Sequence, residues 1–258
     1  NSILSHLRKT NLPLDPTAKV VGPRVLHSTQ WGLFDPIDTP DGGNIGLHKH
    51  FAVGAYVTQG YSRTHIIAWL REKVDMKLIE DCTPVIISSM TKVFVNGFWC
   101  GVINEPEEVV DKFLLFRRNA LIPIYTSICF DKKLNTIFIY TDAGRICRPI
   151  FYKDKETNKF PFENKHVIEL ISKNEFSWFD LICGFNEKKD DSFHPNHYKM
   201  YELNQLYNNV NNENNPAKLE TFLSKKAIID FIDTNETENS LIALNQDTLT
   251  KKLNYTHM

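Results

Sequence analysis

The sequence predicts an α+β fold of several modules, each built from short strands, hairpins and short helices. Three features indicate this fold. Hydrophobic residues make up 42% and charged residues 24% of the 258 residues, as is typical of a chain that folds. The dipeptide Asn96-Gly97 separates two runs rich in β-forming residues. Residues 64–73 and 106–118 place apolar side chains at helical spacing.

The chain is long enough for one large domain or for two to three small ones, and shifts in composition favour several modules. We expect three segments, at residues 1–61, 62–152 and 153–258. The first is dense in Pro, Gly, Asp, Thr and His, with turn signals at residues 35–36 and 39–43. It is therefore expected to be ordered loop around a few short elements.

The second segment is expected to begin with a short amphipathic helix over residues 64–73, in which Ile66, Ile67 and Leu70 share one face. A hairpin follows, because Asn96-Gly97 tolerates the two positive φ angles of a type I′ turn. We expect Trp99, in the second strand of this hairpin, to pack against the next helix.

That next helix is predicted to be capped by Asn104, with Pro106 in its first turn, acidic residues near the positive end of its dipole and two arginines at its end. Residues 137–140 and 146–148 are predicted strands around a turn at 141–144. The module is expected to end near Tyr152.

The third segment opens with a charged linker and a predicted helix over residues 167–173. Residues 204–215 are rich in Asn, which favours an exposed insertion. Residues 225–231 and 240–244 regain apolar character and are predicted to form short elements. Since the sequence opens on Asn1 and not on Met, we expect it to be a fragment.

Charge and cysteine content limit the function classes. The net charge of −1 gives no global positive field, so any contact with DNA must come from a local patch. No Cys-x-x-Cys pair occurs, which leaves a structural zinc site without support. Scattered, reduced thiols in a reducing compartment are expected for the five cysteines: Cys82, Cys100, Cys129, Cys147 and Cys183.

Four motifs, in order, carry a resemblance to one family. Residues 5–11 read SHLRKTN, residues 22–32 read GPRVLHSTQWG and lead into DPIDTPDGGNIGL at 35–47, residues 93–102 read VFVNGFWCGV, and residues 141–149 read TDAGRICRP. Together they resemble the second-largest, beta-type subunit of multisubunit DNA-directed RNA polymerase, where the second motif marks the fork region. The third and fourth motifs are most similar to the eukaryotic, archaeal and large DNA virus branch.

The resemblance implies that the three segments correspond to domains 3, 4 and 5 of that subunit, the last truncated. This sequence departs from the family's pattern at Asp35, where most relatives have Cys, and at Asp38 and Asp41, where they have Glu. The shorter carboxylates keep the charge and re-set any salt bridge or cap. Asp35 in place of Cys is expected to add a negative charge beside the nucleic acid. These changes favour a divergent lineage, and the Asn- and Lys-rich tail suits a large DNA virus.

The resemblance also implies a role. The family joins nucleotides by in-line transfer between two Mg²⁺ ions, bound by the largest subunit, so we expect no catalytic residue and no metal on this fragment. The expected role of this fragment is contact with nucleic acid near the downstream fork. Expected partners are the largest and other polymerase subunits, the DNA template, the RNA–DNA hybrid and ribonucleoside triphosphates. The expected location is intracellular, in the nucleus or, for a virus, in a cytoplasmic factory or virion.

Candidate site residues fall into two groups. Basic residues expected to contact phosphates without sequence preference are Arg8, Lys9, Lys19 and Arg24. Solvation of a loop or pairing with neighbouring acids is the alternative role for each of them. The residues expected to shape the motifs are His27, Thr29, Trp31, Gly32, Thr39, Pro40, Asp41, Gly42, Gly46, Asn96, Gly97, Asp142, Gly144 and Arg145.

Other patterns have simpler explanations. The run Asp35, Asp38 and Asp41 lacks the spacing of a calcium loop, so turn and cap roles are favoured. Metal ligation is a minor alternative for His48 with His50, and for His194 with His197. The four tryptophans can stack on bases, although core packing is commoner: Trp31, Trp69, Trp99 and Trp178.

Three hypotheses therefore remain open. The first is a polymerase subunit segment that contains the fork region. The second is a free-standing, non-catalytic, polymerase-like module that binds DNA or another subunit. The third is an unrelated metal-dependent hydrolase built on the Asp run, which explains none of the four ordered motifs.

Overall fold

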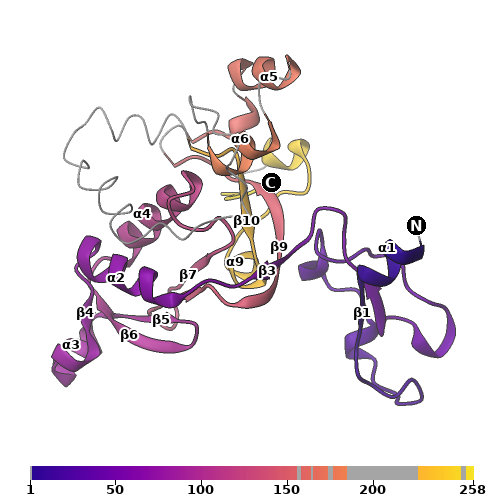
Figure 1. Ribbon diagram of the computed structural model, residues 1–258, viewed down its shortest axis with the longest axis horizontal. Coiled ribbons are helices and arrows are strands. Elements are labelled where there is room, and N and C mark those ends of the chain that lie inside the picture. Colours follow the sequence, from indigo (N-terminus) through magenta and orange to yellow (C-terminus); the bar gives the residue numbers. More distant parts are fainter. Residues whose placement is uncertain (1, 156–157, 164, 174–176, 185–225, 251–253) are drawn as a thin grey trace.

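The computed structural model describes residues 2–155, 158–163, 165–173, 177–184, 226–250 and 254–258 (Figure 1). The predicted Asn-rich insertion at 204–215 and the pair His194 and His197 lie outside the described residues. The α+β class is confirmed, because short helices and three small sheets alternate along the described chain.

The helices and strands have the following bounds. The α-helices are α1 (Ser2–Leu7), α2 (Arg63–Lys73), α3 (Pro84–Ser89), α4 (Pro106–Arg118), α5 (Lys165–Ser172), α6 (Trp178–Cys183) and α9 (Thr234–Glu238). The strands are β1 (Lys9–Asn11), β2 (His48–His50), β3 (Tyr56–Gln59), β4 (Lys77–Leu78), β5 (Thr91–Val95), β6 (Phe98–Ile103), β7 (Ser127–Asp131), β8 (Thr136–Tyr140), β9 (Ala143–Phe151) and β10 (Ile229–Ile232). Short 3-10 helices include η1 (Gly22–Arg24), η2 (Ser28–Gln30), η3 (Gly42–Asn44), η4 (Ile79–Asp81), η5 (Pro161–Glu163) and η7 (Gln246–Thr250).

The largest sheet has five strands in the order β4-β6-β5-β8-β7, and α2 and α4 pack on one face of it (Figure 1). The predicted hairpin is confirmed as β5 and β6, with φ of 50° at Asn96 and 76° at Gly97. The predicted amphipathic helix is confirmed as α2. Its Trp69 packs edge-on against Phe113 and Phe116 of α4 in the main hydrophobic core.

Two local predictions in this module are wrong. The N-cap of α4 is Glu105 and not Asn104, because Pro106 is the first helical residue and disfavours helical geometry in the residue before it. Trp99 does not pack on α4. It lies directly opposite Phe94 in the hairpin, on the other face of the sheet, and the two rings stack with centroids 5.9 Å apart.

The predicted strands around residues 141–144 are confirmed as β8 and β9, but they belong to different sheets. Strand β8 runs parallel to β5 in the large sheet, whereas β9 is the centre of a three-stranded sheet with the order β10-β9-β3. This smaller sheet takes one strand from each of the three predicted segments. It therefore joins the beginning and the end of the described chain to the middle (Figure 1).

The third segment contains the predicted helix, here α5, and the first of its two predicted short elements is the strand β10. Ser177 caps α6 through a capping box with Asp180. Near the end of the chain, Met258 exchanges two backbone hydrogen bonds with Phe151, both 2.9 Å long. The segment thus packs on β9.

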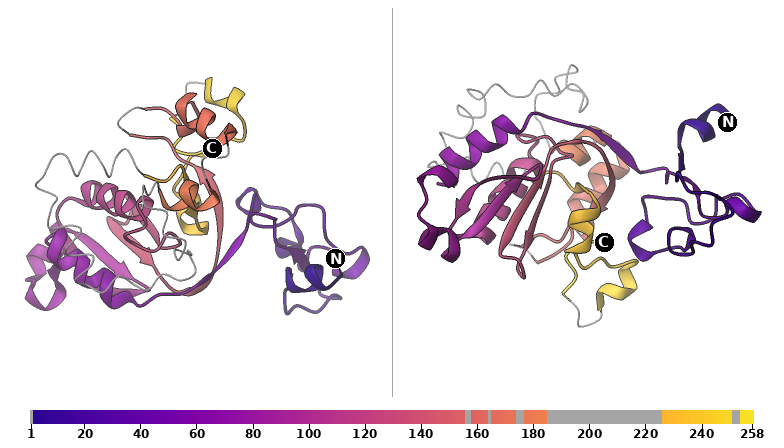
Figure 2. Two further views of the ribbon diagram at one scale, coloured as in Figure 1. Left: turned by 45° about the horizontal axis from the view of Figure 1, so that its top comes forward. Right: turned by 90° about the horizontal axis from the view of Figure 1, so that it is seen from below.

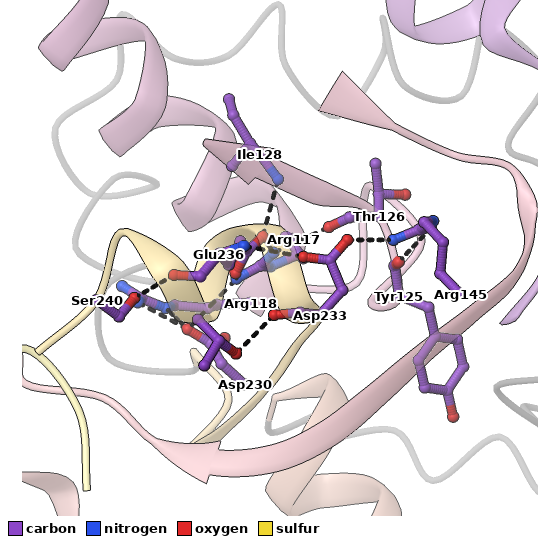
Figure 3. A network of polar contacts seen from close by, with 11 residues as sticks. Arg117, Arg118, Tyr125, Thr126, Ile128, Arg145, Asp230, Asp233, Glu236 and Ser240 are labelled. Carbon is purple, nitrogen blue, oxygen red and sulfur yellow. Dashed lines mark hydrogen bonds and ion pairs between the residues drawn. The ribbon is translucent and has the colours of Figure 1, made fainter. Parts of the chain in front are cut away.

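A network of buried ions fixes this segment to α4 (Figure 3). The guanidinium of Arg117, 2% exposed, donates to Glu236 at 2.5 Å and to the carbonyl of Thr126 at 2.9 Å. Arg118 donates to Asp230 through Nε at 2.9 Å and Nη2 at 2.8 Å. Three arginines face three carboxylates in the network, whose remaining pair is Arg145 and Asp233 at 3.0 Å.

Burial and charge act against each other in this network. Burial opposes the charged form of Arg117, but Glu236 and Asp230 outweigh it and raise the pKa of the guanidinium. Burial likewise opposes the charged form of Asp230, and Arg118 and Arg117 nevertheless lower its pKa. Burial raises the pKa of Glu236. Each charge is therefore tolerated in the interior only while its partners are present.

Two further features of the described residues bear on function. All five cysteines are free, and four of them are buried while Cys82 is partly exposed. Within the described residues, none of the helices has the length and apolar character to cross a bilayer.

We expect the substitution Arg117→Met to lower the free energy of unfolding by about 3–5 kcal/mol, because it leaves buried carboxylates without their partner. Chemical denaturation of the chain, followed by circular dichroism, measures the change. The matched control is Lys132→Met, which breaks an exposed ion pair with Glu107 and should change stability little. Equal effects of the two substitutions would contradict a dominant role for the network.

Candidate nucleic-acid interface

The predicted basic candidates lie in one part of the molecule, the N-terminal loop unit (residues 2–55), which stands to one side of the sheets (Figure 2). Strands β1 and β2 form its small sheet, in which Lys9 lies opposite His50. Leu33 and Leu47, each 2% exposed, provide its small core. Because regular structure is sparse here, side-chain hydrogen bonds to backbone carbonyls hold the loops together.

Arg24 is the centre of these hydrogen bonds. Its Nη1 donates to the carbonyls of Gly43 at 2.5 Å and Ile45 at 3.1 Å. Its Nη2 donates to Pro16 at 2.9 Å, and its Nε donates to Val20 at 3.2 Å. The guanidinium therefore joins loops from both halves of the unit, a role that the sequence did not predict.

The four hydrogen bonds of the Arg24 guanidinium form a clamp on the loops, and Gly46 completes it. Its φ is +72°, and a Cβ atom at this position would overlap the carbonyl oxygen of Arg24. Only glycine fits such a backbone approach. The hydroxyl of Thr39 accepts from the backbone N–H of Gly46 at 2.9 Å and donates to the carbonyl of His48 at 2.9 Å. The predicted motif residues Thr39 and Gly46 thus shape the same turn.

The other basic candidates differ in their surroundings. Arg8 is partly buried, and its Nη2 donates to the carbonyl of Ala52 and, at 3.4 Å, to that of Val53. Lys9 and Lys19 are exposed, and their side chains have no polar partner among the described residues. Of the four basic candidates, these two lysines are the ones whose ammonium groups face solvent without a protein acceptor.

The motif around Trp31 is anchored from outside the loop unit. His27 is the N-cap of η2, and its Nδ1 accepts from the backbone N–H of Thr29 at 3.3 Å. The carbonyl of Trp31 accepts from Nη1 of Arg148 on β9 at 2.5 Å. Gly32 has φ of +76°, and a Cβ atom there would lie 2.9 Å from the Arg148 side chain. Arg148 was not among the predicted site residues.

Of the Asp run, Asp35 has the expected turn role. Oδ1 of Asp35 accepts from the backbone N–H groups of Ile37 at 2.9 Å and Asp38 at 3.3 Å. Asp38 lies 3.2 Å from Nδ1 of His50. Asp41 occupies the N-cap of η3 without a side-chain hydrogen bond, between Pro40 and Gly42, whose φ is +77°. Among the described residues, no cluster of His, Cys, Asp and Glu could hold a metal ion.

The remaining motif residues lie in strands or in the turns between them, and not in the loop unit. The side chain of Asn96 donates to Oγ1 of Thr141 at 2.9 Å and accepts from its N–H at 2.7 Å, which ties the hairpin turn to the end of β8. Arg145 pairs with Asp142 at 3.1 Å and with Asp233 at 3.0 Å. Gly144, with φ of +81°, is the second residue of β9. These residues support the fold.

We expect Arg24→Lys to destabilise the loop unit, because one ammonium group cannot replace a planar guanidinium group that donates to four backbone carbonyls. Faster amide hydrogen exchange at residues 16–46, with unchanged exchange in β5 and β6, is the expected result. Lys19→Met serves as the control, since Lys19 has no polar partner among the described residues. Unchanged exchange in the Arg24→Lys variant would refute the clamp.

Comparison with known proteins places these features in a family. Residues 1–57 match the family model described as RNA polymerase Rpb2, domain 3, and residues 93–154 match RNA polymerase Rpb2, domain 4. The first of these ranges contains the loop unit. The second runs from the hairpin to just beyond the end of β9.

Curated relatives agree with these matches. The chain is 37% identical over 197 residues to DNA-directed RNA polymerase II subunit RPB2 of Schizosaccharomyces pombe, covering 71% of this chain and 16% of the relative. It is 31% identical over 253 residues to the subunit of the same name from Eremothecium gossypii, covering 96% of this chain and 18% of the relative. It is 26% identical over 268 residues to DNA-directed RNA polymerase subunit Rpo2 of Sulfolobus acidocaldarius, covering 100% of this chain and 20% of the relative.

The chain thus spans less than a fifth of the length of the first relatives, 16% in the Schizosaccharomyces pombe protein. The relatives are eukaryotic and archaeal, in agreement with the branch expected from the hairpin motif. The chain belongs to the family of second-largest subunits of DNA-directed RNA polymerase and corresponds to a fragment of such a subunit.

Proposed function

We propose that this chain, as part of a polymerase second-largest subunit, contributes to DNA-templated RNA synthesis by contacting nucleic acid near the downstream fork. The observation that carries the proposal is the match of residues 1–57 to domain 3, combined with the exposed ammonium groups of Lys9 and Lys19, which have no polar partner among the described residues. The loop unit holds these lysines on a scaffold of backbone hydrogen bonds.

The chemistry suits this role. Lysine is a compact point charge that attracts phosphate without reading base sequence. A transcribing enzyme must move along every sequence, so sequence-independent and salt-sensitive contacts are the appropriate kind. Arg8 and Arg24 stay candidates for phosphate contact, but Nη2 of Arg8 and all three guanidinium nitrogens of Arg24 already donate to backbone carbonyls. Their first contribution is to the shape of the unit.

The assembled enzyme would supply the rest of the reaction. We propose that the catalytic Mg²⁺ ions are bound by the largest subunit, and that the partners of this chain include that subunit, the DNA template, the RNA–DNA hybrid and ribonucleoside triphosphates. We also propose an intracellular location for the assembled enzyme. A viral origin stays a prediction from the sequence. Nucleotidyl transfer would be a property of the complex.

The alternative is a free-standing, non-catalytic module that binds DNA or another subunit. Antibody pull-down from the source cells, followed by intact mass measurement, separates the two. A polypeptide far heavier than 29.9 kDa that co-purifies with a largest subunit supports the proposal. A polypeptide of 29.9 kDa alone supports the module.

We expect neutralisation by Lys9→Gln and Lys19→Gln in the assembled polymerase to weaken DNA binding. The slope of log K against log salt should shrink by about one for each phosphate that the variant no longer neutralises. Fluorescence anisotropy with labelled DNA across a salt series measures both quantities. Lys133→Gln, an exposed lysine in the turn between β7 and β8, is the matched control. An unchanged slope would remove both lysines from the interface.

A further inference from the structure

The loop unit contains an open hollow of about 550 Å³. Trp31 lines it and is 59% exposed, although aromatic side chains of this size are usually buried. The other apolar lining residues include Leu26, Phe34, Ile37 and Val53. An exposed indole beside a hollow is an arrangement that favours a planar ligand able to stack.

Two arginines lie behind the lining of this hollow, where each donates to the backbone carbonyl of a lining residue. The carbonyls of Ala52 and Val53, both lining residues, accept from the guanidinium of Arg8. On another wall, the carbonyl of Trp31 accepts from Arg148. Arg148 is only 7% exposed and has no carboxylate partner among the described residues. Two positive charges thus lie behind the lining, and the lining itself contains one carboxylate, that of Asp35.

The polar lining can also bond to a base edge. Gln30 lines the hollow, and its side-chain amide has no hydrogen-bond partner among the described residues. An amide offers both a donor and an acceptor, which is what the edge of a nucleobase requires. His27, also in the lining, uses Nδ1 for Thr29 and keeps its other ring nitrogen available.

We propose that this hollow receives an unpaired base of the DNA strand opened at the fork, stacked on Trp31, with Arg8 as the cation for its phosphate. The inference rests on the proposed function, since it names the ligand of the same loop unit. Arg148 and Gly32 act as positioning residues, because the guanidinium packs against Gly32 and holds the Trp31 backbone. Stacking tolerates any base, as a moving fork demands.

The test uses the assembled polymerase and DNA with a mismatched bubble, in which 2-aminopurine replaces one base at a time. With the natural chain, one bubble position should show quenched fluorescence. Trp31→Ala should relieve that quenching and weaken binding of the bubble DNA at least about fivefold, whereas Trp31→Phe should retain most of both. The matched control is Trp178→Ala, which removes a 52% exposed tryptophan at the start of α6.

A second measurement distinguishes a base from other occupants. Oxidative footprinting read by mass spectrometry should find Trp31 reactive in the polymerase without DNA and protected when bubble DNA binds. Protection without DNA would mean that protein covers the hollow, and would overturn the inference. Protection by RNA alone, or equal fluorescence in the Trp31→Ala and Trp178→Ala variants, would also overturn it.

The two proposals can fail separately. The salt slope of the Lys9 and Lys19 variants tests phosphate contact and does not depend on stacking. A reduced slope with an unaffected Trp31→Ala variant would leave the proposed function in place without the base site. An unchanged slope combined with relief of quenching would keep the base site and remove the lysines.

Discussion

The buried contact between Arg117 and Glu236 is the interaction on which the arrangement of the chain most depends. The two residues lie far apart in sequence, yet the guanidinium and the carboxylate meet in the interior at 2.5 Å. Glu236 also accepts from the backbone N–H of Ile128 at 2.8 Å, so one carboxylate joins α9, α4 and β7. Because each ion is costly to bury alone, the network forms as a unit or not at all.

Some local features of the fold were predictable from sequence, although the N-cap of α4 was not, and the long-range ion network was missed. Helical spacing in α2 and the Asn96-Gly97 dipeptide report on geometry within a few residues, and both predictions are confirmed. The ion network was missed because its arginines and carboxylates are separated by 112 and 119 positions in two of its pairs. At the end of α4, Arg117 and Arg118 have a simple local explanation as partners of the helix dipole.

The loop unit shows the same limit. The sequence indicated the motif residues, but it could not separate arginines that hold loops from lysines that face solvent. That distinction depends on whether a carbonyl happens to lie within reach of the side chain. Arg24 meets four carbonyls and Lys19 meets no polar group among the described residues. Motif membership therefore does not by itself predict the role of a basic side chain.

The three-stranded sheet has a consequence for how the chain is made. Its central strand β9 ends at Phe151, but its partner β10 begins only at Ile229, so the sheet cannot be completed until much later in synthesis. The entropy of closing such a loop grows slowly, by about 0.6 kcal/mol for each doubling of its length. Related chains can thus differ widely in the number of residues between these strands and still complete the same sheet.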